Sequence, residues 1–302
     1  MLVDIDIIPL LSKTEAFLNT MYYVEIDLSL KPQKQHIATC IKYSGLIQLR
    51  GNFIRQLTNS VIKYVYSGAK QTQILEELTT GNDAVDESDA ITELYQQACQ
   101  YFRPSDIHGQ FSELLLFNFL QHHFKALPVV RKMTITTNPA VERNGADAIH
   151  LAKVNPGEYI VYLGEAKTYT SGFKKAFQSA LKSIITAYNE HRKELQLYNY
   201  SEFLEEPVRE LMKDYLKCKI DLPVKLVVII SYCTGNTPNK TNAEDFHKHY
   251  IEDAVKECQK IVDADYANIN EGLLPQLHYI IFPVDELAKL LDDFKLKLGI
   301  KP

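Results

Sequence analysis

Three polar residues in the middle of the chain have the types and the spacing that metal-dependent cleavage of a phosphodiester requires. Asp147 lies in the stretch GADAIHL, and Glu165 and Lys167 follow at the end of the apolar run YIVYLGEAK. A hard divalent cation binds carboxylate oxygens, and a metal and a lysine together can stabilise the charge that the phosphodiester gains under attack. The three residues therefore predict a nuclease site that uses Mg²⁺, or Mn²⁺ in its place.

The segments around these residues predict a β-hairpin. Residues 145–154 and 159–167 have the apolar character of strands, and the turn residues Asn-Pro-Gly separate them at 155–157. Two strands joined by so short a connection pair antiparallel. The hairpin therefore brings Asp147 close to Glu165 and Lys167 on one sheet.

Strand geometry then predicts how the functional groups face. Alternate side chains of a strand share a face, so Glu165 and Lys167 are expected to point the same way. The backbone carbonyl of Ala166, between them, can serve as a further oxygen ligand for the metal. Asp147 lies in the partner strand and is expected to converge with them.

The helices on either side of the hairpin supply further candidates. Glu113 is a lone carboxylate in an apolar helix expected over 111–124, where it is costly to bury without a partner or a metal. Gln178, on a helix expected over 173–195, could hold a water or a phosphate. Three lysines form the expected DNA-binding patch: Lys174, Lys175 and Lys182. A solvated helix face is an equally good interpretation of the first two.

The remaining patterns predict an α/β fold. Further strands are expected over 129–137, 224–232 and 277–284, and a further helix over 243–262. The run at 224–232 is continuously apolar, as in a strand buried on both faces. The resulting order α-β-β-β-α-β-α-β gives a mixed central sheet flanked by helices.

The chain is expected to divide near residue 90. Residues 79–90 are polar and acidic without helical periodicity, which is typical of a solvated connection. Residues 1–90 form the expected N-terminal α+β region, with a strand at 22–30 and mostly helix at 46–67; this region is a candidate contact surface for a partner or for DNA. Residues 91–302 hold the expected nuclease domain.

Composition excludes several other classes of protein. An apolar content of 46% and a charged content of 24% are ordinary for a soluble globular protein. The net charge of −5 argues against a basic protein that coats nucleic acid, although a local basic patch can still contact phosphates. The five cysteines are scattered, so no zinc site is expected. No apolar run approaches the roughly 20 residues of a membrane helix, and the N-terminus lacks a basic leader, so we expect a cytoplasmic protein without membrane contact.

Other catalytic motifs are absent from the sequence. There is no GxSxG, GxxxxGK[ST] or GxGxxG pattern, so esterase-type hydrolase, NTPase and dinucleotide-binding interpretations have no starting point. His150 follows Asp147 by three residues and could orient water or substrate, but a structural role is the preferred interpretation. The same holds for His122, His123, His247 and His249.

The predicted elements, with Asp147, Glu165 and Lys167, resemble the PD-(D/E)XK nuclease superfamily over residues 105–285. Gly145-Ala146-Asp147 stands where the superfamily usually has Pro-Asp, so the proline is missing here. More narrowly, the series HGQFSELLLFNFL, NGADAIHL, YLGEAKTY and FQSAL, with the chain length and the N-terminal extension, resembles the HamA-type effector subunit of the Hachiman anti-phage defence system.

This resemblance implies a bacterial Mg²⁺-dependent deoxyribonuclease with a restriction-endonuclease-like core and little sequence preference. It implies a superfamily 2 helicase partner of the HamB type, which restrains the nuclease and activates it on DNA. Asp147, Glu165 and the Ala166 carbonyl would hold the metal, and Glu113 would complete the shell directly or through water. Lys167 would position the attacking water or stabilise the developing negative charge, and Gln178 would help to orient the water.

Two alternatives stay open: a catalytically inert DNA-binding or regulatory subunit of the same fold, and a stand-alone restriction-type endonuclease. The intact Asp147, Glu165 and Lys167 argue against an inert subunit. Co-purification with a helicase would separate the stand-alone enzyme from the effector subunit.

Overall fold

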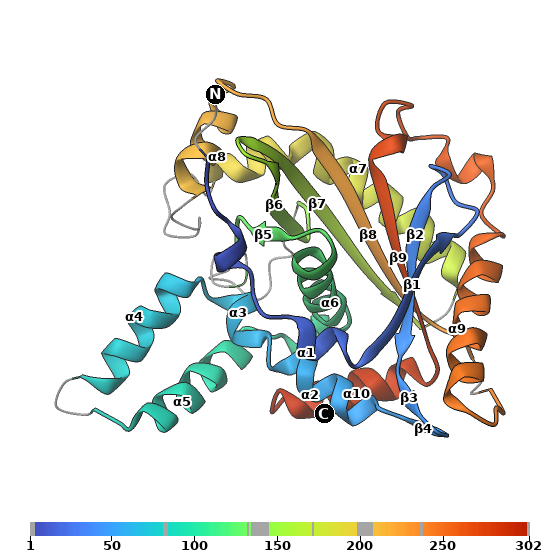
Figure 1. Ribbon diagram of the computed structural model, residues 1–302, viewed down its shortest axis with the longest axis horizontal. Coiled ribbons are helices and arrows are strands. Elements are labelled where there is room, and N and C mark those ends of the chain that lie inside the picture. Colours follow the sequence, from blue (N-terminus) through green and yellow to red (C-terminus); the bar gives the residue numbers. More distant parts are fainter. Residues whose placement is uncertain are drawn as a thin grey trace.

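A seven-stranded mixed sheet forms the centre of the computed structural model, which describes residues 4–80, 84–131, 133, 145–170, 172–197, 208–235 and 238–300. The strand order is β1-β2-β9-β8-β7-β6-β5 (Figure 1). The strands are β1 (Met21–Asp27), β2 (Gln35–Ile41), β5 (Ala126–Pro128), β6 (Ala148–Asn155), β7 (Glu158–Tyr169), β8 (Val224–Cys233) and β9 (Leu277–Val284). Strands β3 (Tyr43–Ser44) and β4 (Ile47–Gln48) pair separately. The predicted α/β fold with a mixed sheet flanked by helices is confirmed.

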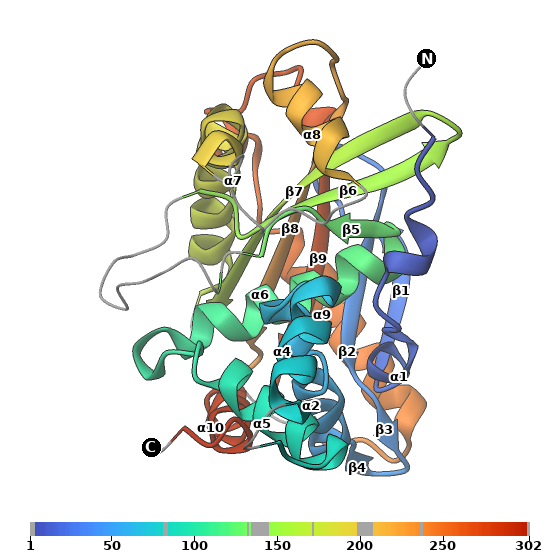
Figure 2. The same ribbon diagram turned by 90° about the vertical axis from the view of Figure 1, so that its left-hand side faces the viewer.

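Helices cover both faces of this sheet (Figure 2). They are α1 (Glu15–Leu18), α2 (Arg50–Thr58), α3 (Val61–Val65), α4 (Gly68–Thr79), α5 (Glu87–Cys99), α6 (Ile107–His123), α7 (Phe173–Leu197), α8 (Arg209–Leu216), α9 (Ala243–Cys258) and α10 (Leu287–Lys297). The antiparallel pair α4 and α5 projects from the body as an arm (Figure 1). In the part of the chain that the structure describes, none of these helices has the length and apolar character needed to cross a membrane.

Alternation along β7 divides the core into two layers. Val161 and Leu163 belong to the cluster that α7 completes, whereas Ala166 belongs to the cluster that α6 completes. Helix α6 is apolar on almost every side because it packs between the sheet and the helices of the N-terminal region. Helix α7 has only one apolar side and leaves the other to solvent. Side chains at odd positions of β7 therefore point towards α7.

The predicted hairpin is confirmed as β6 and β7, which pair antiparallel with Ala148 opposite Gly164. Gly157 in its turn has a φ of +73°, which a glycine adopts without strain. Strand β7 also pairs parallel with β8, which places Glu165 beside Val228. Strand β8 is almost fully buried, as its continuous apolar run predicts. The motif strand therefore lies inside the sheet, with a partner on each side.

The strand expected over 129–137 is wrong in position. The strand that precedes the hairpin is β5, at Ala126–Pro128, and Val129 to Arg131 continue beyond it. Val129 and Val130 are buried in the core, and the Val129 amide still donates to the Ile149 carbonyl of β6 over 2.8 Å. Lys132 and residues 134–137 lie outside the described residues. Strand β2 and helices α4, α5, α8 and α10 are elements that the sequence patterns did not indicate.

The N-terminal region is part of the same sheet. Strand β1 pairs with β2, and β2 pairs parallel with β9, where Ile37 lies opposite Ile280. The connection expected over 79–90 is too long, because α4 ends at Thr79 and Glu87 to Ala90 already belong to α5. The division into an N-terminal region over residues 1–90 and a nuclease domain over 91–302 stays a prediction.

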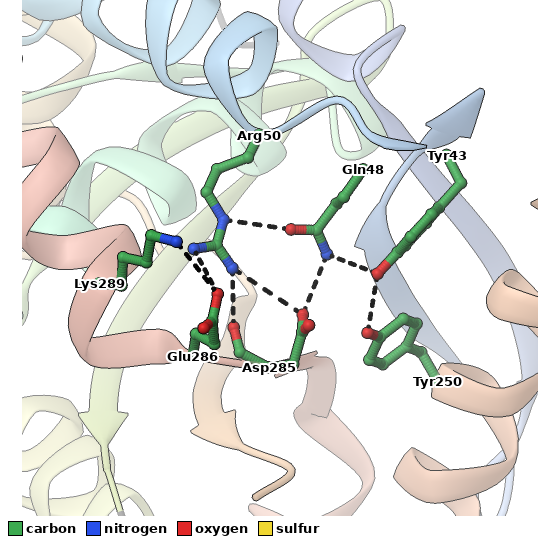
Figure 3. A network of polar contacts seen from close by, with 7 residues as sticks. All are labelled: Tyr43, Gln48, Arg50, Tyr250, Asp285, Glu286 and Lys289. Carbon is green, nitrogen blue, oxygen red and sulfur yellow. Dashed lines mark hydrogen bonds and ion pairs between the residues drawn. The ribbon is translucent and has the colours of Figure 1, made fainter. Parts of the chain in front are cut away.

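A polar network fastens this region to the C-terminal end of β9 (Figure 3). The side-chain amide of Gln48 donates to Asp285 Oδ1 over 3.1 Å, and Arg50 donates to the Asp285 carbonyl over 3.0 Å. Arg50 also pairs with Glu286, at the start of α10, over 3.4 Å. Through these contacts Arg50, the first residue of α2, links β4 and α2 to the start of α10.

Gly164 allows α6 to cross close over β7, and we expect Gly164→Ala to destabilise the fold. A Cβ at this position would lie 2.7 Å from Cδ2 of the fully buried Leu116 and 3.1 Å from Cβ of Ala148. The expected loss in the free energy of unfolding is about 1–3 kcal/mol, as for other overpacked cores, measured by urea denaturation. Adding Leu116→Ala opens space, so the double variant should lose less than the sum of the single losses. Strict additivity would contradict this account.

Candidate active site

The structure brings Asp147, Glu165 and Lys167 together where β6 begins and β7 ends. The Ala166 amide donates a hydrogen bond to Asp147 Oδ2 over 2.8 Å. Lys167 Nζ lies 2.6 Å from Glu165 Oε1. Both Glu165 and Lys167 occupy odd positions of β7 and so point towards α7, as the strand period predicts. The expected convergence of the three residues is present.

Burial sets the protonation behaviour of the pair. Burial raises the pKa of Glu165, which is only 2% exposed, because a buried carboxylate loses its hydration. Lys167 and a hydrogen bond with Ser183 oppose this rise, and repulsion from Glu113 adds to it. Burial lowers the pKa of Lys167, but attraction to Glu165 and Asp147 outweighs burial and leaves the pKa raised. Lys167 is therefore a cation at neutral pH.

Glu113 reaches the same place from α6. A small pocket is lined by Tyr64, Glu113, Phe117, Val130, Arg131, Asp147, Ala148 and His150. The hydroxyl of Tyr64 donates to Glu113 Oε2 over 2.6 Å. Tyr64 lies in α3, so the region before residue 90 contributes directly to the surroundings of Glu113. Glu113 and Asp147 open onto one pocket.

Arg131 and Ser183 are site residues that sequence reasoning missed. Arg131 is 7% exposed, and its Nε donates to the carbonyl of Lys63 over 3.0 Å. A lone arginine in the apolar run VVRKM was a usable signal, since buried arginines are rare without partners. Ser183 lies on α7 and hydrogen-bonds with Glu165. Nothing in its local sequence separates it from other helix serines.

Hydrogen bonds between α6 and β7 hold the motif strand just beyond Lys167. Thr168 Oγ1 donates to the carbonyl of His108 over 2.9 Å and also hydrogen-bonds with Ser112. The Ser112 hydroxyl also lies 3.3 Å from Ser231 Oγ on β8. These contacts fix the end of β7 against its neighbours, which limits the movement of Lys167.

Gln178 contacts Asp265 instead of the proposed metal ligands Asp147 and Glu165. Its amide donates to Asp265 Oδ1 over 2.6 Å, and Lys174 pairs with Asp265 Oδ2 over 3.0 Å. Five residues separate Gln178 from Ser183, which is about 140° around a helix, so the two point in different directions. Lys175 and Lys182 are exposed on α7, and their contact with DNA stays a prediction.

His150 has a structural position. The residue is 2% exposed, and its Nδ1–H donates to the carbonyl of Ala126 over 3.0 Å. Burial lowers its pKa to about 3, so the ring is neutral at physiological pH. His247 likewise accepts from the amide of Tyr43 and stacks on Tyr22. The prediction that these two histidines have a structural role is therefore supported by their contacts.

The ligand atoms at the site fit a hard divalent cation in type. Asp147, Glu165 and Glu113 supply carboxylate oxygens, which such ions prefer. Within the described residues, however, no three Asp, Glu, His or Cys side chains are gathered into a ready metal-binding cluster. Glu165 contacts Lys167, and Asp147 contacts the Ala166 amide. A cation would therefore compete with these internal contacts for the same carboxylates.

Comparison with family models matches the chain to the HamA family over residues 15–298. The match extends from α1 to just past α10 and includes Tyr64, Glu113, Asp147, Glu165 and Lys167. Comparison with curated proteins finds no match. The mixed sheet agrees with the restriction-endonuclease-like core that the first resemblance implies. Because the match covers nearly the whole chain, the protein belongs to the HamA family, the family of the Hachiman defence subunit that its sequence resembles.

Proposed function

We propose that the protein is a Mg²⁺-dependent deoxyribonuclease that serves as the effector of a Hachiman defence complex. The observation that supports this most is the convergence of Asp147 with the buried Glu165–Lys167 pair on neighbouring strands. An ion pair that serves stability alone gains little from burial, because desolvation offsets the attraction between the charges. A buried carboxylate, a cationic lysine and a second carboxylate together suit phosphodiester hydrolysis.

Each residue has a distinct part in the proposed reaction. The Asp147 and Glu165 carboxylates and the Ala166 carbonyl would hold Mg²⁺, or Mn²⁺ in its place, with Glu113 completing the ligand set. The bound ion supplies Lewis-acid stabilisation of the phosphoryl oxygens and lowers the pKa of a water. Lys167, protonated at neutral pH, stabilises the negative charge that develops on the phosphate.

We further propose that a superfamily 2 helicase partner delivers the DNA and restrains the nuclease until DNA is engaged. The net charge of −5 supports this division of labour, since the chain lacks a generally basic surface for DNA. Lys175 and Lys182, exposed on α7, are the residues proposed to contact the DNA backbone. Lys174 is proposed to do so after leaving Asp265.

DNA digestion with and without Mg²⁺ tests the proposed function. Wild type, Asp147→Ala and Lys167→Ala are compared, each with and without the helicase partner. Cleavage is expected only from wild type, only with Mg²⁺, and most strongly with the partner on DNA. Equal cleavage by wild type and Asp147→Ala would overturn the assignment of the site. If wild type cleaves none of several forms of DNA with both the partner and Mg²⁺ present, the result would favour an inert subunit.

Tyr64→Phe is expected to reduce cleavage about 10-fold, the lower end for loss of a group that orients a metal ligand. The change removes the hydroxyl that donates to Glu113, while the ring keeps its packing 5.3 Å from Phe117. Initial rates of DNA cleavage provide the measurement. Tyr66→Phe, another buried tyrosine but outside the pocket, serves as the matched control and should leave the rate unchanged. Equal rates for Tyr64→Phe and wild type would remove Tyr64 from the site.

A further inference from the structure

A second buried carboxylate holds the backbone that leads into Asp147. Glu194 lies near the C-terminal end of α7 and is 6% exposed. Its Oε2 accepts a hydrogen bond from the amide of Ala146 over 3.0 Å. Ala146 immediately precedes Asp147, so this bond fixes the chain one residue before the proposed metal ligand.

Gly145 shows how closely the chain approaches this carboxylate. A Cβ at Gly145 would lie 2.1 Å from Glu194 Oε2 and 2.5 Å from its Cδ. Gly145 also has a φ of +107°, a conformation that side-chain-bearing residues rarely adopt. The backbone therefore lies directly against Glu194, and only glycine permits this approach.

The hydrogen bond between Ala146 and Glu194 offers a physical reason why the proline of the motif is absent here. In the PD-(D/E)XK motif that the chain resembles, proline stands where this chain has Ala146. A proline fixes its own backbone torsion but has no amide hydrogen to donate. Ala146 has that hydrogen and uses it on Glu194. A long-range hydrogen bond can thus restrain the backbone here in place of the ring.

Helix α7 contacts the proposed metal ligand Glu165 directly and the backbone just before Asp147. Ser183, which hydrogen-bonds with Glu165, and Glu194 are eleven residues apart, close to three full helical turns. The two therefore lie on the same side of α7. One rigid helix supports Glu165 through Ser183 and the chain before Asp147 through Glu194.

We propose that Glu194 is the positioning residue for Asp147, a role that rests on the proposed nuclease function. Glu194 acts through the Ala146 amide and is not itself one of the proposed metal ligands. Its carboxylate keeps Asp147 turned towards β7, where Oδ2 meets the Ala166 amide. Without the hydrogen bond between Glu194 and the Ala146 amide, Asp147 can move and the metal site is weakened, while the Glu165–Lys167 pair remains in place.

Glu194→Ala and Glu194→Gln test the proposal through two independent measurements. Hydrogen exchange at the Ala146 amide is expected to accelerate at least about 10-fold in Glu194→Ala, since the acceptor is gone, and Mn²⁺ affinity should fall about 10-fold. Glu194→Gln should keep most of the protection of the Ala146 amide and most of the Mn²⁺ affinity, because its amide oxygen can still accept from Ala146. Glu190→Ala, exposed on the same helix, is the matched control and should change neither.

Unchanged exchange at Ala146 and unchanged Mn²⁺ affinity in a folded Glu194→Ala protein would overturn the proposal. If Glu194→Ala does not fold, Glu194→Asp decides, because its shorter side chain keeps the charge but withdraws the oxygen from Ala146. Protection of Ala146 in that variant would also overturn the proposal. If wild type neither binds Mn²⁺ nor cleaves DNA, the proposed function fails, whereas the exchange measurement still shows whether Glu194 holds the Ala146 amide.

Discussion

Glu165→Gln is expected to reduce DNA cleavage by about 10³-fold, at the upper end of the effect of removing one group that stabilises a transition state. Glutamine has nearly the shape of glutamate, so the fold around β7 should survive. It lacks the charge that would bind Mg²⁺, and it ends the ion pair with Lys167 over 2.6 Å. Single-turnover cleavage with the helicase partner present measures the rate, and Mn²⁺ titration measures the metal affinity.

A matched control lies on the same strand. Glu158→Gln changes an exposed glutamate at the opposite end of β7, whose Oε2 accepts from the side-chain amide of Asn155 over 2.6 Å. Its cleavage rate should equal that of wild type. If Glu165→Gln also cleaves at the wild-type rate with unchanged Mn²⁺ dependence, Glu165 does not hold the metal and the proposed mechanism is wrong.

Lys167→Met is expected to lower the free energy of unfolding by about 3 kcal/mol at pH 8, the lower end for breaking a buried ion pair. Glu165 would then be left as a buried carboxylate without its cation. Lys167 itself is 26% exposed at its side chain, which is why the lower end of the range applies. Urea denaturation monitored by fluorescence or circular dichroism measures the loss.

The loss should depend on pH in a defined direction. The pKa of Glu165 is already raised by burial above its ordinary value of 4.5, and removing Lys167 removes an opposing effect, so it rises further. The native state then binds a proton at higher pH than the unfolded state does, and stability falls as the pH rises through that interval. The deficit of Lys167→Met against wild type should therefore be full at pH 8 and shrink towards pH 5.

The double variant separates the unpaired charge from lost packing. Glu165→Gln with Lys167→Met leaves no buried charge, so it should be more stable at pH 8 than Lys167→Met alone. A double variant that is as unstable as Lys167→Met at pH 8, with no dependence on pH, would show that packing of the lysine stem causes the loss.

Local patterns allowed the centre of the site to be predicted. The alternation of β7 and the Asn-Pro-Gly turn place Asp147, Glu165 and Lys167 on one side of a hairpin, and both signals act over a few residues. The same local reasoning placed the strand before the hairpin at 129–137, whereas β5 begins at Ala126, because its ends are set by pairing with β6. It also placed Gln178 at the site, since the direction of a helix face depends on how the helix lies against the sheet.

The chain by itself determined which residues could perform the chemistry and that a hairpin would gather the central three. Only the tertiary structure decided what supports them: Tyr64 meets Glu113 across 49 positions of sequence, and Glu194 meets Ala146 across 48. Such contacts have no periodic signal, because they depend on how α3, α6 and α7 pack against the sheet. Side-chain period and turn chemistry are properties of short segments, whereas the partner of a buried polar group is chosen by the packing of the whole fold.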